Sequence, residues 1–302
     1  MQFSQPISVV GGGSGSLVDL AGLLEQGADA YYFLPDGAAV NALRSDVIKS
    51  DQIGVDEVLN AALAQGRLQS AACLSEAMLA SDTTFVRTDG CKENTLEELL
   101  LQIAGCLAQT DNYHLVVIRD TVAPGFMDTQ IKPLLERVSG RRCGEDFGLC
   151  YAPEVVRNEV ALADYRNPVR MLVGAEESAS ADALIALFHS RTGAVVRGSW
   201  QEIEVTRKMD QRWHALKMVF AEQMREECDV HGIEFDAVQS AFARDTKLNL
   251  SSVQINANSV RIPLGEDGSI HVAAILAPAQ SAAENDESYD TKISSLRLAS
   301  VS

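Results

Sequence analysis

A glycine-rich run, Gly11 to Ser16, is the feature that most restricts what this chain can fold into. It follows the short apolar run Ile7–Val10 and precedes a segment in which leucines recur with helical spacing. The order of strand, glycine-rich turn and helix is the context in which a dinucleotide-binding fingerprint is credible. Gly11 and Gly13 fill the first two glycine roles, which are the tight turn and the close backbone approach. Ser16 stands at the third position, where we expect its side chain to intrude between helix and strand.

The residue at the end of the next strand is expected to contact the ribose of a bound dinucleotide. We expect that strand at Ala30–Leu34, and an acidic residue at its end would bind the ribose hydroxyl groups. Counted without gaps, that position is Leu34, and Asp36 follows two residues later. Asp36 either reaches the ribose through a shift of the loop or is only a turn residue before Gly37, and the two readings have equal weight. The pattern therefore indicates no preference between NAD and NADP.

Alternating strands and helices predict the fold class. Along residues 1–196, apolar runs with the length of buried strands alternate with segments of helical spacing. This alternation predicts an α/β fold with a Rossmann-like, doubly wound parallel sheet. The later strands are expected at Leu68–Cys73, Thr84–Val86, Leu115–Ile118, Phe147–Tyr151, Met171–Gly174 and Ala194–Val196, with helices at Glu93–Ala108 and Ala179–Ser190.

A long helical run follows the expected sheet. Between Trp200 and Val230, apolar residues recur every three or four positions, and Gly232 stops the run. About 30 residues span ~45 Å as a helix, which is longer than a small domain needs and typical of a spine shared between subunits. We expect a central helical dimerisation domain at 197–278, with a second helix at Phe235–Arg244. Residues 279–302 are rich in Gln, Ser, Ala, Glu, Asn and Asp and are expected to be a mostly disordered tail.

The charge and the cysteines argue against several classes of function. The net charge of −17 repels phosphate backbones, so we expect no nucleic-acid partner. An anionic nucleotide would need local positive charge, for which the candidates are Arg157, Arg207, Lys208 and Arg212. The six cysteines form no C-x-x-C pair and no cluster with histidine, which predicts reduced thiols, a cytoplasmic location and no metal site. The sequence has neither an apolar run of 18 residues nor a signal-peptide pattern, so we expect no membrane span.

The stretch from Asp120 to Asp164 carries the most specific pattern. A buried strand leads into Thr121, a Pro-Gly pair turns the chain, and the next strand ends at Ala152-Pro153-Glu154. Polar side chains thus follow two neighbouring strands at the edge where open α/β sheets bind their ligands. The stretch resembles the central signature of the UDP-glucose/GDP-mannose dehydrogenase family, roughly S-T-V-x-P-G-T followed by N-P-E-F-L-R-E-G. The segments Trp213–Lys217 and Asp245–Ser251 resemble the GDP-mannose branch of that family.

The resemblance implies a cofactor, a ligand and an assembly. Members of the family oxidise the primary alcohol of a nucleotide sugar to a carboxylate and consume two NAD. The resemblance therefore implies NAD, a possible nucleotide-sugar ligand, and a homodimer built through the long helix at 200–230. The residues that it assigns to cofactor binding are Gly11, Gly13, Ser16, Asp36 and Thr121.

The resemblance also assigns catalytic candidates. Thr121 matches a threonine that positions a water molecule, and Glu154 matches the first glutamate of the signature. The helical motif E-x-x-K-x-x-x-N is matched by Glu204, Arg207 and Gln211, so a cation and an amide keep their spacing. Each candidate also has a competing interpretation. Thr121 could serve only in a turn, and Glu154 could be an ordinary carboxylate at a strand end. Arg207 and Gln211 could belong to a solvated helix face.

Other positions depart from the family pattern. The second glutamate is replaced by Asn158, whose amide cannot act as a general base. Arg207 in place of lysine is planar and does not give up its proton at neutral pH. The nucleophilic cysteine that would capture the aldehyde is expected near Gly265, but no cysteine follows Cys228. We also expect the C-terminal nucleotide-sugar-binding domain of the family to be absent.

These features leave three hypotheses open. The first is an NAD-dependent nucleotide-sugar 6-dehydrogenase with impaired or no full turnover, because the nucleophilic cysteine is missing. The second is a non-catalytic dimeric scaffold or regulatory relative. The third is a two-electron alcohol dehydrogenase that stops at the aldehyde and needs Thr121 and Glu154 but no thiol.

Overall fold

The computed structural model describes residues 5–35, 50, 52–88, 91, 95–154, 160–188, 191 and 193–244. The chain divides into two compact units, Met1–Arg207 and Lys208–Ser302, each of which is described by itself. The division falls inside one continuous helix, α9, which runs from Trp200 to His231. The predicted tail and most of the second half of the predicted helical domain lie outside the described residues.

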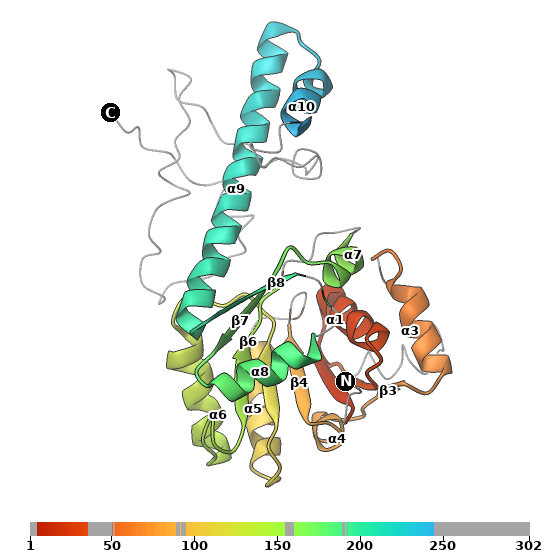
Figure 1. Cartoon of the computed structure of the whole chain (residues 1–302), viewed down its shortest axis with the longest axis vertical. Helices are drawn as coiled ribbons and strands as arrows, with labels where there is room; N and C mark the ends of the chain where they lie inside the picture. Colours follow the sequence, from red (N-terminus) through yellow and green to blue (C-terminus); the bar gives the residue numbers. More distant parts are fainter. Residues whose placement is uncertain are drawn as a thin grey trace. The chain divides into compact units, whose positions relative to one another are not determined.

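The first unit is built on one eight-stranded sheet with the order β3-β2-β1-β4-β5-β6-β7-β8 (Figure 1). Its strands are β1 (Ile7–Gly11), β2 (Ala30–Phe33), β3 (Leu68–Ser70), β4 (Thr83–Arg87), β5 (Leu115–Ile118), β6 (Gly148–Tyr151), β7 (Arg170–Ala175) and β8 (Ala194–Gly198). The strand order reverses between β1 and β4, both of which point the same way. The predicted α/β class is confirmed, and the reversal places a ligand crevice at the carboxyl ends of β1 and β4.

Two local differences from the predicted sheet have clear causes. β7 runs antiparallel to β6, because the short helix α7 (Ala161–Arg166) packs on α1 (Gly13–Glu25) and the chain re-enters the sheet at the end where β6 stopped. β3 is shorter than predicted and ends at Ser70. The Ala71 amide still donates to the Tyr32 carbonyl at 3.0 Å, but the chain then turns into helix α4 (Leu74–Leu79).

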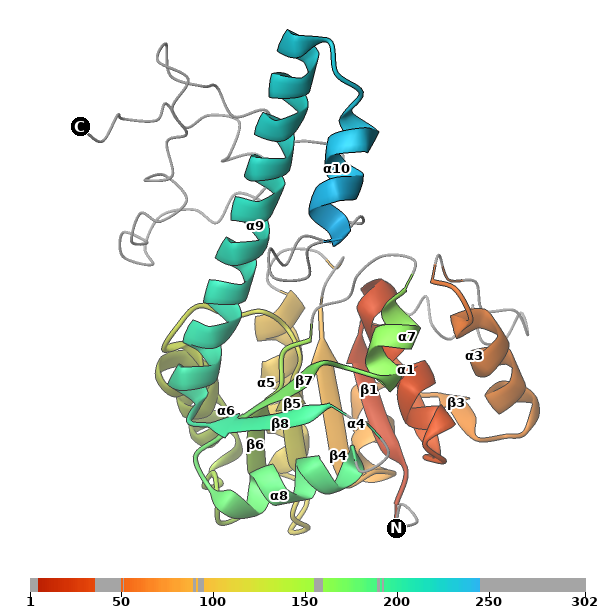
Figure 2. The same ribbon diagram turned by 45° about the horizontal axis from the view of Figure 1, so that its top comes forward.

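Helices cover both faces of the sheet, and strand residues alternate between the two apolar layers (Figures 1 and 2). Val9 of β1 faces the layer that contains α1, α3, α7 and α8, whereas Val10 faces the layer that contains α4, α5 and α6. The helices are α1 (Gly13–Glu25), α3 (Val55–Ala64), α4 (Leu74–Leu79), α5 (Thr95–Leu107), α6 (Lys132–Ser139, entered through a π-helical turn at Met127–Ile131) and α8 (Ser178–Leu187). Trp200 and Ile203, at the start of α9, join the second layer.

The second unit contains the rest of α9 and the helix α10 (Phe235–Arg244), as the sequence predicts. Gly232 adopts a positive φ of 62° directly after α9, the left-handed conformation in which many helices end. The rings of Phe220 and Phe242 lie 6.0 Å apart and hold the two helices together. The guanidinium of Arg225 lies over the ring of Phe235 at 3.9 Å.

Candidate functional site

The glycine-rich turn has the conformation that its sequence predicts. Gly11 and Gly13 adopt φ angles of +121° and +82°, which favour glycine. A side chain at Gly11 would overlap the backbone carbonyl of Arg87, the last residue of β4, and the Gly12 amide donates to that same carbonyl at 3.1 Å. Helix α1 begins at Gly13 with no side-chain cap among the described residues and no acidic residue in its first turn. An uncapped helix N-terminus behind closely packed glycines fits the diphosphate of a dinucleotide.

Ser16 is accommodated at the third glycine position. It is fully buried, and its hydroxyl donates to the Gly13 carbonyl at 2.9 Å and lies 3.4 Å from the Tyr32 hydroxyl of β2. The extra polar group is therefore hydrogen-bonded rather than an obstacle between helix and sheet. Asp36, the other predicted ribose contact, lies outside the described residues.

Loops after β4 and β5 are tied to each other at the carboxyl edge of the sheet. Asp120 accepts hydrogen bonds from the Thr88 amide at 2.8 Å and from the Thr88 hydroxyl at 2.6 Å. Thr121 follows directly and is exposed. The position of Thr121 is thus fixed from one side by the β4 loop.

The first turns of α9 fix the same loop from the other side. Glu204 is fully buried and accepts the Gly125 amide at 2.6 Å and the Met127 amide at 2.8 Å. One turn later, Arg207 donates from Nε to the Thr121 hydroxyl at 3.1 Å. The structure therefore brings together two of the predicted catalytic residues, Thr121 and Arg207. Gln211 lies in α9 within the second unit and is described apart from them.

Glu154, the predicted strand-end carboxylate, lies in a group of ion pairs. One of its carboxylate oxygens pairs with Arg119, which follows β5, and the other pairs with Arg191. Both guanidinium groups are almost completely buried, whereas the Glu154 side chain keeps 16% of its surface exposed. Arg191 also donates to the Tyr165 carbonyl at 2.8 Å and stacks on the Tyr165 ring. Both oxygens of Glu154 are thus engaged with arginines.

The ion pairs continue to helix α1 through Asp19, which is fully buried. Asp19 accepts from Arg119 at 2.7 and 3.1 Å and from Arg87 at 3.2 Å. Burial alone would raise the pKa of the Asp19 carboxyl, but the Arg119 and Arg87 guanidinium groups hold it below its usual value. We call the five residues Arg87, Asp19, Arg119, Glu154 and Arg191 the ion-pair chain, since cations and anions alternate along it.

Sequence reasoning missed Asp19, Arg87, Arg119 and Arg191. A signal was present, because Asp19 interrupts the apolar run Leu17–Leu24 and two of the arginines directly end or follow apolar strands. Charged residues in such places are almost never buried unless they are paired. The candidates Lys208 and Arg212 lie in the second unit, and Arg157 lies outside the described residues.

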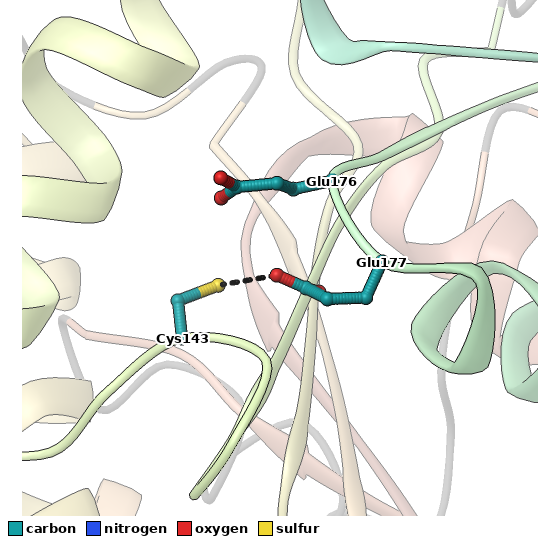
Figure 3. Close-up of side chains that lie close together, drawn as sticks. All are labelled: Cys143, Glu176 and Glu177. Carbon is teal, nitrogen blue, oxygen red and sulfur yellow. Dashed lines mark hydrogen bonds between the residues drawn. The ribbon is translucent and has the colours of Figure 1, made fainter.

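One group of possible metal ligands occurs in the described part of the chain, in the loops that precede β6 and follow β7. Cys143, Glu176 and Glu177 point toward one another, and the Cys143 sulfur lies 4.0 Å from Glu177 Oε1 (Figure 3). Burial and the Glu177 carboxylate raise the pKa of the Cys143 thiol to about 12, and Lys132 already pairs with Glu176. Because the Glu176 carboxylate is already paired with Lys132, these residues are described as a packed surface group.

Comparisons with known proteins agree with this geometry. The model of the UDP-glucose/GDP-mannose dehydrogenase family, NAD binding domain, matches residues 5–192. A GDP-mannose 6-dehydrogenase of Pseudomonas putida is 30% identical over 227 residues, which are 71% of this chain and 52% of that protein. A UDP-glucose 6-dehydrogenase of Haloferax volcanii is 26% identical over 80% of this chain and 59% of that protein. The chain thus spans about half the length of the curated relatives that it matches.

Solved structures give the same result. A ternary complex of GDP-mannose dehydrogenase from Pseudomonas aeruginosa superposes with a TM-score of 0.74 and 26% identity over 81% of this chain and 58% of that chain. A UDP-glucose dehydrogenase from Pyrobaculum islandicum has a TM-score of 0.72 at 24% identity, covers 82% of this chain and 58% of its own, and supports the fold. No described helix has the length and apolar character needed to cross a membrane. The chain therefore belongs to the UDP-glucose/GDP-mannose dehydrogenase family, nearer its GDP-mannose branch, and its resemblance to the NAD binding domain of that family supports NAD as the cofactor.

Proposed function

We propose that this chain binds NAD at the glycine-rich turn but does not complete the four-electron oxidation of a nucleotide sugar to its uronate. The observation that carries the proposal is the setting of Glu154, whose two carboxylate oxygens pair with Arg119 and Arg191. A general base must keep an acceptor site directed at the proton that it removes, and two buried guanidinium groups already occupy acceptor sites on both oxygens of this carboxylate. In this proposal Glu154 has a structural role, since its carboxylate bridges the buried guanidinium groups of Arg119 and Arg191.

The remaining polar pair, Thr121 and Arg207, supports the same conclusion. Arg207 donates to the Thr121 hydroxyl, so it orients Thr121 as a donor toward an acceptor atom. The guanidinium can stabilise negative charge, but it stays protonated at neutral pH and cannot exchange a proton with a substrate. The second oxidation further needs a thiol to hold the aldehyde, and residues 229–302 contain no cysteine.

NAD supplies hydride acceptance when it is bound, and the candidate donor is a nucleotide sugar. GDP-mannose appears in the name of the Pseudomonas putida relative, and UDP-glucose in the name of the Haloferax volcanii relative. Isothermal titration with NAD, followed by incubation with NAD and each sugar while NADH absorbance is recorded, tests the proposal. We expect saturable NAD binding without steady NADH formation.

Each other outcome of that experiment separates the hypotheses. Steady formation of uronate with two NADH per sugar would overturn the proposal. One NADH per sugar, with an aldehyde captured by a hydrazine reagent, would instead establish the two-electron dehydrogenase. Failure to bind NAD at millimolar concentration would leave the scaffold as the function of the chain.

A second candidate function, a dimeric scaffold, is supported by the surface of α9. Four large apolar side chains of this helix are between 38% and 48% exposed: Val205, Met209, Trp213 and Phe220. Apolar side chains of this size at helical spacing favour a partner helix, and a second copy supplies the same surface. Light scattering after size exclusion should give a dimer, and Trp213→Glu should give a monomer. A monomeric parent chain at tens of micromolar would contradict a homodimer through residues 200–230.

A further inference from the structure

Gly12, the middle residue of the glycine-rich turn, is a glycine that the dinucleotide fingerprint does not require. The fingerprint needs glycine at positions 11 and 13, and the residue between them can carry a side chain. The backbone of Gly12 is extended, with φ of −136° and ψ of −171°, which other residues also adopt. A Cβ atom there would instead lie 2.7 Å from the Cys91 sulfur and 3.2 Å from a methyl group of Leu34. The glycine is therefore explained by the thiol that lies against it.

This contact brings together three loops at one edge of the sheet. Gly12 follows β1, Leu34 follows β2, and Cys91 comes shortly after the end of β4. The strand order reverses between β1 and β4, so the ligand crevice lies between their carboxyl ends. Gly12 is also the N-cap of α1, and the amides that begin this helix fit a diphosphate. The thiol of Cys91 therefore lies at the part of the crevice that suits the diphosphate of a dinucleotide.

Hydrogen bonds fix the position of Cys91 at this edge. Its amide donates to the Thr88 carbonyl at 2.9 Å, which closes a tight turn after β4. Thr88 is held in turn by Asp120, which accepts the Thr88 amide at 2.8 Å and the Thr88 hydroxyl at 2.6 Å. Cys91 is half-buried, so it packs against Gly12 and still keeps part of its surface open to solvent. The residue thus has a defined place beside the turn.

We propose that Cys91 is a cofactor-contacting residue whose thiol lies beside the diphosphate of bound NAD, so that NAD binding and covalent modification of this thiol exclude each other. This proposal rests on the proposed NAD binding. A group attached to the sulfur has no room on the side of Gly12 and Leu34, where even one added carbon atom would lie 2.7 Å from the sulfur. The added group must extend into the crevice instead. Conversely, a bound dinucleotide covers the sulfur and blocks the approach of a reagent.

Alkylation by iodoacetamide, followed by mass spectrometry of the peptides, tests the proposal on the full chain. The cysteine sulfur forms a bond to the acetamide carbon, iodide leaves, and the thiol proton passes to the buffer. With NAD at about ten times its dissociation constant, about one eleventh of the protein is free, so alkylation of Cys91 should slow about elevenfold. ADP, which carries the diphosphate, should protect equally at the same multiple of its own dissociation constant. Cys73, an exposed thiol at the start of α4, is the internal control and should react at an unchanged rate.

The reverse experiment measures NAD binding by titration calorimetry after alkylation. The alkylated parent chain should bind NAD at least about tenfold more weakly than the untreated chain, a loss of ~1.4 kcal/mol or more. Cys91→Ser is the matched control, because its other cysteines meet the same reagent. Treated and untreated Cys91→Ser should bind NAD with equal affinity. A loss in this variant as large as in the parent would assign the effect to another thiol and overturn the proposal.

The protection experiment needs no variant, and its other outcomes refute the proposal. Cys91 would not lie beside the diphosphate if it failed to react in the free chain under conditions that label Cys73, if NAD left its rate unchanged, or if NAD protected it and ADP did not. Equal protection of Cys73 would show a general tightening of the chain instead of a local contact. If calorimetry finds no NAD binding, the proposed function fails and this inference with it. If NAD binds and Cys91 stays reactive, only this inference fails.

Discussion

Replacing Asp19 by asparagine should destabilise the first unit strongly. Asp19 is fully buried and accepts three hydrogen bonds from two arginines. Removing one partner of a buried ion pair leaves an uncompensated charge and costs about 3–5 kcal/mol. Asparagine keeps one acceptor oxygen, so we expect the free energy of unfolding to fall by about 3 kcal/mol.

The loss should depend on pH with a definite sign. The folded-state pKa of Asp19 is lowered, so the unfolded chain binds its proton first as the pH falls. The stabilisation by Asp19 is therefore complete above the unfolded pKa of about 4 and is lost as the pH falls through the folded pKa. The difference between the parent and Asp19→Asn should be constant from pH 5 to 8 and should shrink below pH 4.

Urea unfolding followed by tryptophan fluorescence measures this difference. The chain has two tryptophans, and Trp213→Phe leaves the buried Trp200 as a reporter of the first unit. Glu25→Gln is the control, because Glu25 belongs to the partly exposed pair with Arg166 and should cost less than about 1 kcal/mol. If Asp19→Asn lowers the free energy of unfolding by less than about 1 kcal/mol, or by no more than the control does, the proposed contribution of the ion-pair chain to stability is refuted.

Three further predictions concern Glu204, the glycines of two helices and His114. Glu204→Ala should lower the free energy of unfolding by about 2–4 kcal/mol in urea titrations, because one buried and one half-buried backbone amide lose their acceptor. A loss under about 1 kcal/mol would contradict these two contacts. Gly15→Ala should destabilise because its methyl group overlaps the Arg87 guanidinium, whereas Gly105→Ala in α5, which meets nothing within 4 Å, should stabilise by about 0.5–1 kcal/mol in the same assay. Burial lowers the pKa of His114 to about 4, so its ring proton shifts in NMR should stay constant from pH 8 to 5.5, and a midpoint near 6.5 would contradict that burial. Because the unfolded histidine binds its proton first, this residue should reduce stability as the pH falls from about 6.5 toward 4.

The sequence predicts the sheet and the glycine-rich turn because both depend on local patterns. Runs of apolar residues mark the strands, and Gly11 and Gly13 mark positive backbone angles that other residues rarely adopt. The long helix and its end at Gly232 follow from helical periodicity in the same way. Each of these features is decided by residues within a few positions of one another.

The setting of Glu154 could not be predicted, because its partners are remote in sequence. Arg119 lies 35 residues away and reaches Asp19 across 100 residues. The signature motif places Glu154 at a strand end, but only the folded sheet brings the arginines against it. The antiparallel direction of β7 also depends on tertiary packing, because α7 packs on α1.

The most direct test counts the NADH formed per nucleotide sugar by the chain under conditions in which titration calorimetry has shown that NAD is bound. With GDP-mannose or UDP-glucose in excess, we predict no steady rise in NADH absorbance and no uronate in the product, because Glu154 is paired with two arginines and residues 229–302 contain no cysteine. Continuous turnover with two NADH per uronate would contradict that prediction.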